Sequence, residues 1–98
     1  SLSKISFPSS LTSIGSYAFY NCVKLKEIKF PSSLISIGEN SFENCKLIEE
    51  LEFPSSVISI GEKAFYYCSS LKQIIIHSSS FTSIGKDAFP LDKIITKI

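Results

Sequence analysis

Apolar positions recur along the chain with a period of 23 residues. In residues 25–47, Leu25, Ile28 and Phe30 have the L-x-x-I-x-F spacing that is typical of a short strand with alternate side chains pointing inward. A second extended segment, 34–37, sends two more apolar side chains inward. The same pattern fills residues 2–24, 25–47, 48–70 and 71–94, and residues 95–98 open a fifth copy. A fixed period of this length predicts a solenoid, in which each coil buries its apolar face against its neighbours.

Turn-forming residues divide each copy at the same points. Pro31 follows the first strand and ends it, because proline has no N–H to donate to a ladder. A glycine comes after the second strand in every copy, and it indicates either a positive φ or a close approach of neighbouring coils. These glycines are Gly15, Gly38, Gly61 and Gly85. Glu39 and Glu62 then suit the positive end of a helical turn. The pattern predicts an α/β solenoid with right-handed connections, a parallel sheet on one face and helical turns opposite.

Equivalent residues of successive copies should stack along the solenoid, with strands roughly 4.8 Å apart. We expect Phe42 and Phe65 to be buried and stacked on each other and on Phe19. Cys22, Cys45 and Cys68 share the same spacing, but they lack a C-x-x-C pair and a second type of ligand, which argues against zinc. We interpret them as buried, reduced thiols. A disulfide between two neighbours remains the alternative.

Composition limits the class of partner. The 98 residues are enough for one domain, and a net charge of +1 provides no overall attraction to nucleic acid. Residues 48–70 carry four glutamates against one lysine and form an acidic band. No apolar run reaches the length of a membrane-spanning helix, so we expect no membrane insertion by this segment. The chain begins and ends within the repeat pattern, so we expect a fragment of a longer array that associates through its ends, favouring a two-fold dimer.

Residues that point outward from the strands differ from copy to copy, whereas the inward residues repeat. We therefore predict a protein-binding face on this side of the solenoid. It consists of Lys26, Lys29, Glu49, Glu50, Glu52, Lys72, Gln73 and Ile75. Lys26–Glu49–Lys72 and Lys29–Glu52 place opposite charges on neighbouring strands, so the alternative is a face that only stabilises the sheet and keeps it in solution.

The sequence offers no catalytic constellation. His77, the single histidine, lacks a nucleophile or an orienting partner, and we interpret it as an exposed turn residue. The glycines occur one to a copy rather than in a phosphate-binding loop. We predict no enzyme activity, no cofactor and no metal site. Tyr17, Tyr20, Tyr66 and Tyr67 lie on the turn side, where they form either an exposed patch or a scatter.

The full pattern, L-x-x-I-x-F-P-S-S-L-x-S-I-G-x-x-A-F-x-x-C, resembles the BspA-like, or treponemal-type, leucine-rich repeat. The half I-G-x-x-A-F-x-x-C carries the resemblance, as in Ile14-Gly15, Ala18-Phe19 and Cys22. The resemblance implies a leucine-rich-repeat solenoid from a surface or secreted protein that binds host matrix proteins or cells. A structural or self-assembly scaffold and an intracellular interaction scaffold are the alternatives. The fourth copy departs from the pattern with His77 in place of proline, an added serine, Pro90, and Asp92 in place of cysteine.

Overall fold

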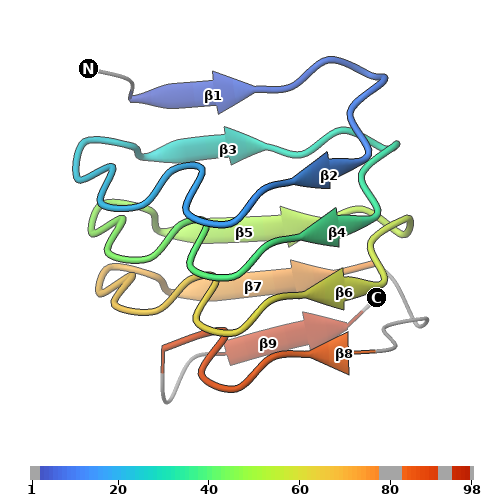
Figure 1. The fold of residues 1–98 in the computed structure, drawn as a ribbon. Coiled ribbons are helices and arrows are strands. Elements are labelled where there is room, and N and C mark those ends of the chain that lie inside the picture. Colours follow the sequence, from blue (N-terminus) through green and yellow to red (C-terminus); the bar gives the residue numbers. More distant parts are fainter. Residues whose placement is uncertain (1–2, 78–82, 91–93, 98) are drawn as a thin grey trace.

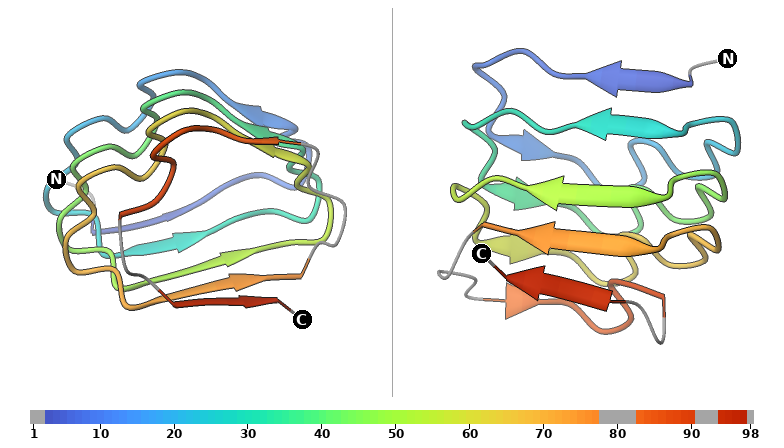
Figure 2. Two further views of the ribbon diagram at one scale, coloured as in Figure 1. Left: turned by 90° about the horizontal axis from the view of Figure 1, so that it is seen from below. Right: turned by 180° about the vertical axis from the view of Figure 1, so that it is seen from behind.

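The chain winds into a solenoid of short parallel strands joined by turns (Figure 1). The structure, a computed structural model, describes residues 3–77, 83–90 and 94–97. Four coils begin at residues 3, 25, 48 and 71 and are called coils 1 to 4. Seen along the axis, each coil has a long strand on one side, a short strand on a second side and turns between them (Figure 2).

The strands form two sides of the solenoid. The long strands are β1 (Lys4–Ser6), β3 (Glu27–Lys29), β5 (Glu50–Phe53), β7 (Gln73–Ile76) and β9 (Ile94–Lys97). The short strands are β2 (Ser13–Ile14), β4 (Ser36–Ile37), β6 (Ser59–Ile60) and β8 (Ser83–Ile84). The short strands pair in one continuous ladder, β2-β4-β6-β8, whereas the long strands pair in two separate sheets, β1-β3 and β5-β7-β9. The side formed by the long strands is called the sheet face.

The register of β9 differs from the one that the sequence pattern predicts. Ile94 pairs with Gln73, so the fifth copy starts earlier than residue 95. Eight residues lead from Phe65 to Gln73, whereas five lead from Phe89 to Ile94. The connection that begins with Pro90 is therefore shorter, and it shifts the last strand by three residues.

The predicted helical turns are wrong, because the described residues contain strands and turns but no helix. The N–H groups of Tyr17, Phe19 and Asn21 donate to carbonyls of coil 2 at 2.7–3.0 Å, so they are not available for bonds within a helix. Positive φ also recurs at intervals of about four residues, which interrupts a right-handed helix. The residues with positive φ are Tyr17, Asn21, Asn40, Asn44, Lys63, Tyr67 and Asp87. The turn side is thus a third ladder of hydrogen bonds between coils.

The glycines are required by close approach and not by positive φ, because none of them has a positive φ. A Cβ atom added to Gly38 would lie 2.7 Å from the carbonyl carbon of Gly15, and one added to Gly61 would lie 2.5 Å from the amide nitrogen of Glu39. At Gly15 nothing lies within 4 Å. Gly38, Gly61 and Gly85 therefore let their coils pack against the preceding one. Gly15 has no preceding coil among the described residues.

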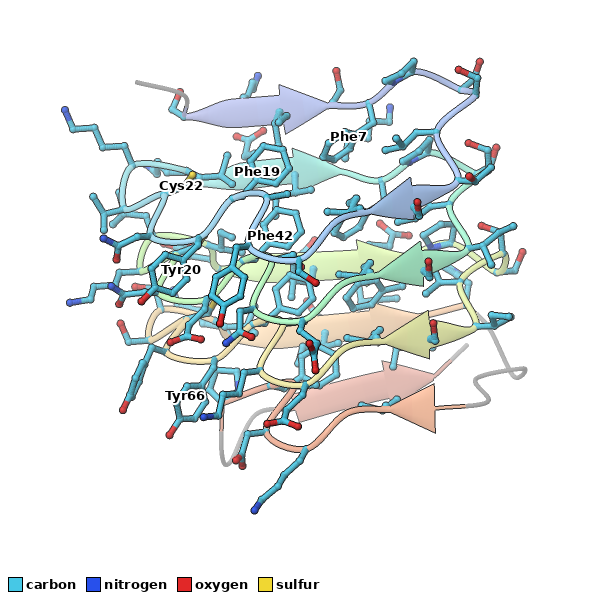
Figure 3. The ribbon with its side chains drawn as sticks, viewed as in Figure 1. Phe7, Phe19, Tyr20, Cys22, Phe42 and Tyr66 are labelled. Atoms are coloured by element: carbon cyan, nitrogen blue, oxygen red, sulfur yellow. The ribbon has the colours of Figure 1, made fainter. Side chains whose placement is uncertain are left out.

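Two columns of phenylalanine rings fill the core. Phe42 and Phe65 are fully buried, and the Phe42 ring stacks at 5.1 Å on both Phe19 and Phe65, which confirms the predicted stacking (Figure 3). The second column contains Phe30 and Phe53, whose centroids are 5.2 Å apart. Phe19 is only half-buried, because the described residues cover coil 1 with a neighbouring coil on one side only.

The three cysteines are free thiols that stack beside the phenylalanine column. Cys45 and Cys68 are buried, as predicted, but Cys22 in coil 1 is half-buried. The thiols of Cys45 and Cys68 donate to the carbonyls of Phe19 and Phe42 at 3.4 and 3.3 Å. Burial raises the pKa of each of these two thiols to about 12.

Candidate functional site

The predicted binding residues lie on the sheet face, in and just before β3, β5 and β7. Six of the eight are exposed, and the remaining two, Gln73 and Ile75 on β7, are half-buried. Their exposure follows from the strand geometry, since alternate residues such as Leu51 and Phe53 point into the core and are fully buried.

The ladder of long strands is interrupted between β3 and β5. Between coils 1 and 2, the N–H of Lys26 donates to the carbonyl of Ser3 at 2.8 Å, and between coils 3 and 4 the N–H of Lys72 donates to Glu49 in the same way. The corresponding bond from Glu49 to Lys26 is absent from the described part of the chain. Coils 2 and 3 remain joined elsewhere, through β4-β6 and through the turn ladder. We call this local interruption the seam.

Two shallow depressions lie along the seam. One, of about 300 Å³, is lined by Ile28, Lys29, Phe30, Glu52, Pro54 and His77. The other, of about 500 Å³, is lined by Lys26, Glu27, Ile28, Leu47, Glu49 and Glu50. Half-buried Ile28 belongs to both. The seam therefore brings together five of the eight predicted residues, whereas Lys72, Gln73 and Ile75 line neither depression.

The ion pairs on the sheet face match the prediction in part. Lys72 Nζ lies 3.6 Å from Glu49 Oε1, as predicted. Within the described residues, Lys26 forms no ion pair with Glu49, and Lys29 forms none with Glu52. Both missing pairs would cross the seam, where the strands are not hydrogen-bonded to each other. Lys26, Lys29 and Glu50 thus form no ion pair within the described residues and remain available to a partner.

The His77 side chain is 36% exposed, in part as predicted, but it is paired with Glu52, which the prediction did not include. Its Nε2 lies 2.5 Å from Glu52 Oε2, and its backbone N–H donates to the carbonyl of Phe53 at 3.2 Å. Proline occupies this position in the other copies and could not donate such a bond. The replacement therefore extends the ladder by one bond and places the imidazole beside the seam.

The sequence interpretation missed Glu27 as a residue of the site. Glu27 lies next to Lys4, at 3.9 Å, and it precedes Glu50 by one period of 23 residues. Like charges directly opposite on neighbouring strands are destabilising, so Glu27 and Glu50 oppose closure of the seam. The two glutamates were visible in the sequence, and their alignment was the signal that could have indicated an open ladder here.

The described residues contain no group of three His, Cys, Asp or Glu side chains arranged to hold a metal ion. They also include no helix long and apolar enough to cross a membrane. What this surface offers chemically is charge and hydrogen bonding around a partly exposed isoleucine.

Comparisons with known proteins agree with the repeat pattern. Residues 1–98 match the family model described as the BspA type leucine rich repeat region (6 copies). A leucine-rich repeat protein from Bacteroides ovatus has a similar solved structure, with a TM-score of 0.82 and 34% sequence identity. The match covers 91% of this chain and 22% of that protein, so this chain spans about a fifth of the length of its structural relative. No curated protein matches.

Proposed function

Because the chain belongs to the BspA-type leucine-rich repeat family, we propose that it is a protein-binding module of a surface or secreted protein and attaches to host matrix proteins or cells. Repeats of this family generally mediate protein interactions and are typically non-enzymatic scaffolds of surface or secreted bacterial proteins. The proposal is more specific, because it assigns binding to the sheet face and centres it on the seam.

The observation that carries the proposal is the combination of free charges and unpaired backbone at the seam. β3 and β5 are not hydrogen-bonded to each other, which leaves backbone polar groups of both strands without a partner within the described residues. Lys26, Lys29 and Glu50 form no ion pair within the described residues. A sheet that only stabilised itself would be expected to close this ladder and pair these charges. Mixed charges around Ile28 suit a protein partner, since interfaces place polar groups around a small apolar centre.

Binding of matrix proteins to the immobilised chain, measured by biolayer interferometry, tests the proposal. The variant Glu50→Lys/Glu52→Lys should weaken binding by roughly tenfold or more, because it reverses the charge of one edge of the seam. Glu39→Lys/Glu62→Lys is the matched control, since it changes the net charge equally at exposed glutamates outside both seam depressions. Equal losses in the two variants would indicate attraction by net charge alone. They would refute a site at the seam.

We further propose that copies associate through their ends, and the backbone polarity favours a head-to-tail contact over the two-fold dimer. The carbonyls of Ser16, Ala18 and Tyr20 accept no hydrogen bond within the described residues, whereas the equivalent carbonyls of coils 2 and 3 do. A two-fold contact would set carbonyl against carbonyl here. The N–H groups of Asp87 and Phe89 at the other end have the matching polarity. Such a contact would continue the turn ladder between coils, and we expect the association to be weak. Light scattering that shows a strict monomer up to high concentration would refute it.

A further inference from the structure

The four tyrosines of the turn side form two pairs of neighbouring rings, one on coil 1 and one on coil 3. Tyr17, Tyr20 and Tyr67 are 58%, 47% and 57% exposed. The rings of Tyr17 and Tyr20 lie 5.4 Å apart on coil 1, and those of Tyr66 and Tyr67 lie 4.1 Å apart on coil 3. Figure 3 shows Tyr20 and Tyr66 on the same side of the solenoid. The two aromatic pairs thus stand on either side of coil 2.

Coil 2 carries polar residues between these aromatic pairs. A depression of about 480 Å³ lies there, lined by Tyr20, Glu43, Asn44, Lys46, Tyr67 and Ser69. We call it the tyrosine groove. Its volume is within the range of roughly 300–1,000 Å³ that is usual for sites of small ligands. A protein partner would instead need about 800 Å² of contact surface on each side, far more than this depression offers.

Two of the tyrosines occupy backbone positions that disfavour them. Tyr17 and Tyr67 have φ values of 59° and 62°, in the left-handed region. At the position of Tyr67, coils 1 and 2 have Asn21 and Asn44, and asparagine adopts this conformation more readily than other non-glycine residues. Folding alone would favour asparagine in coil 3 as well. An exposed aromatic ring at a strained position points to a role in recognition.

The polar groups of the groove retain hydrogen-bonding capacity. Glu43 Oε1 accepts a hydrogen bond from the side-chain amide of Asn40, and the side-chain amide nitrogen of Asn44 donates to Asn21 Oδ1. Glu43 Oε2 and Asn44 Oδ1 have no partner within the described residues. Lys46 forms no ion pair there. The groove therefore combines carboxylate, amide and ammonium groups with two exposed aromatic faces.

We propose that the tyrosine groove binds an oligosaccharide that lies along the solenoid axis. Tyr20 and Tyr67 belong to coils separated by two spacings, roughly 10 Å, a distance of the order of the length of a disaccharide. Each ring would pack against the C–H face of one sugar, as the apolar body of tyrosine allows. Glu43, Asn44 and Lys46 would bind the hydroxyl groups between the rings. This site is separate from the seam and independent of the proposed protein binding.

A glycan array with neutral, amino and acidic oligosaccharides tests the proposal, followed by titration of the bound glycans against the intrinsic tyrosine fluorescence. Tyr67→Asn restores the residue of coils 1 and 2, so it should fold normally. We expect it and Tyr20→Ala each to weaken glycan binding about tenfold or more. The seam variant Glu50→Lys/Glu52→Lys should bind the glycan unchanged.

Absence of any glycan signal above that of Tyr67→Asn would overturn the proposal. Equal affinity of Tyr67→Asn and the parent chain for the glycan would overturn it too. Loss of a protein ligand in Tyr67→Asn, with no glycan bound by the parent, would assign the groove to protein recognition instead. Failure of the seam variant to bind matrix proteins bears only on the proposed function, so the two hypotheses fail separately.

Discussion

Adding one methyl group to a glycine should have opposite effects in coils 1 and 2. In Gly38→Ala the new Cβ would lie 2.7 Å from two backbone atoms of coil 1 and 2.9 Å from the carbonyl oxygen of Ile14. Ordinary contacts of this kind begin at 3.4 Å, and backbone atoms cannot rotate away as a side chain can. Coil 2 would have to move outward, which strains the hydrogen bond of 2.8 Å from the Gly38 N–H to Ile14.

The magnitude follows from these two effects. Overpacking costs about 1–3 kcal/mol, and weakening of one backbone hydrogen bond adds about 0.5–1.5 kcal/mol. We therefore expect Gly38→Ala to lower the free energy of unfolding by about 1.5–4.5 kcal/mol, a large part of the 5–15 kcal/mol that is typical of a domain. In Gly15→Ala nothing lies within 4 Å of the new Cβ. That variant should gain about 0.4–1 kcal/mol, because alanine restricts the unfolded chain more than glycine does.

Urea unfolding of the two variants and the parent, followed by circular dichroism, measures the difference. Gly61→Ala serves as a second test of the same contact, because its Cβ would meet the backbone of coil 2 at 2.5 Å. If Gly38→Ala and Gly61→Ala were as stable as the parent, the close-approach argument would be wrong. If Gly15→Ala were destabilised equally, the outer side of coil 1 would be covered in solution.

Two further predictions concern buried polar groups. Ser41 is fully buried, and its hydroxyl has no hydrogen-bond partner within the described residues. Ser41→Ala restores the alanine of the other coils and should raise the free energy of unfolding, measured in urea melts, by about 1–3 kcal/mol. A loss of stability would show that the hydroxyl is hydrogen-bonded. The pKa of the Cys45 and Cys68 thiols is raised to about 12 in the folded state, so as pH rises the unfolded chain loses these protons first. The free energy of unfolding should therefore fall by about 1.4 kcal/mol per pH unit per thiol once the pH exceeds the ordinary thiol pKa near 9. Cys45→Ala should show a shallower decline between pH 8 and 10, and an unchanged slope would contradict the assignment.

The repeated positions of the fold were predictable from the sequence because packing alone determines them. The column of Phe19, Phe42 and Phe65 followed from one period, since an equivalent residue in a stacked coil has an equivalent neighbour. The turns were not predictable in this way. Apolar spacing around Phe42 is compatible with a helical turn, and only the hydrogen bonds between coils, such as that from Phe19 to Ser41, decide against it.

The sequence was sufficient to predict which residues of the candidate site point outward, but not the interruption of the ladder at the seam. Alternation along the strands showed that Lys29 and Glu52 point outward, which their exposure confirms. Their expected ion pair assumed that every pair of neighbouring strands closes in the same way. Closure depends on small differences in free energy between charges at the surface, such as the repulsion of Glu27 and Glu50, and a repeat pattern does not record these differences.

A residue that departs from the repeat therefore indicates a function only when its exposure is also known. Ser41 and Tyr67 both replace the residue that the other coils favour, and both should destabilise the coil that carries them. Ser41 is fully buried and can contact only its own chain, so its replacement by alanine should increase stability and leave binding unchanged. Tyr67 is 57% exposed at the edge of the tyrosine groove, so its replacement by asparagine should raise stability slightly and weaken glycan binding. Each variant restores the residue that the other coils have at that position. Comparing the two therefore separates a packing defect, which changes stability alone, from a residue retained for recognition, which also changes binding.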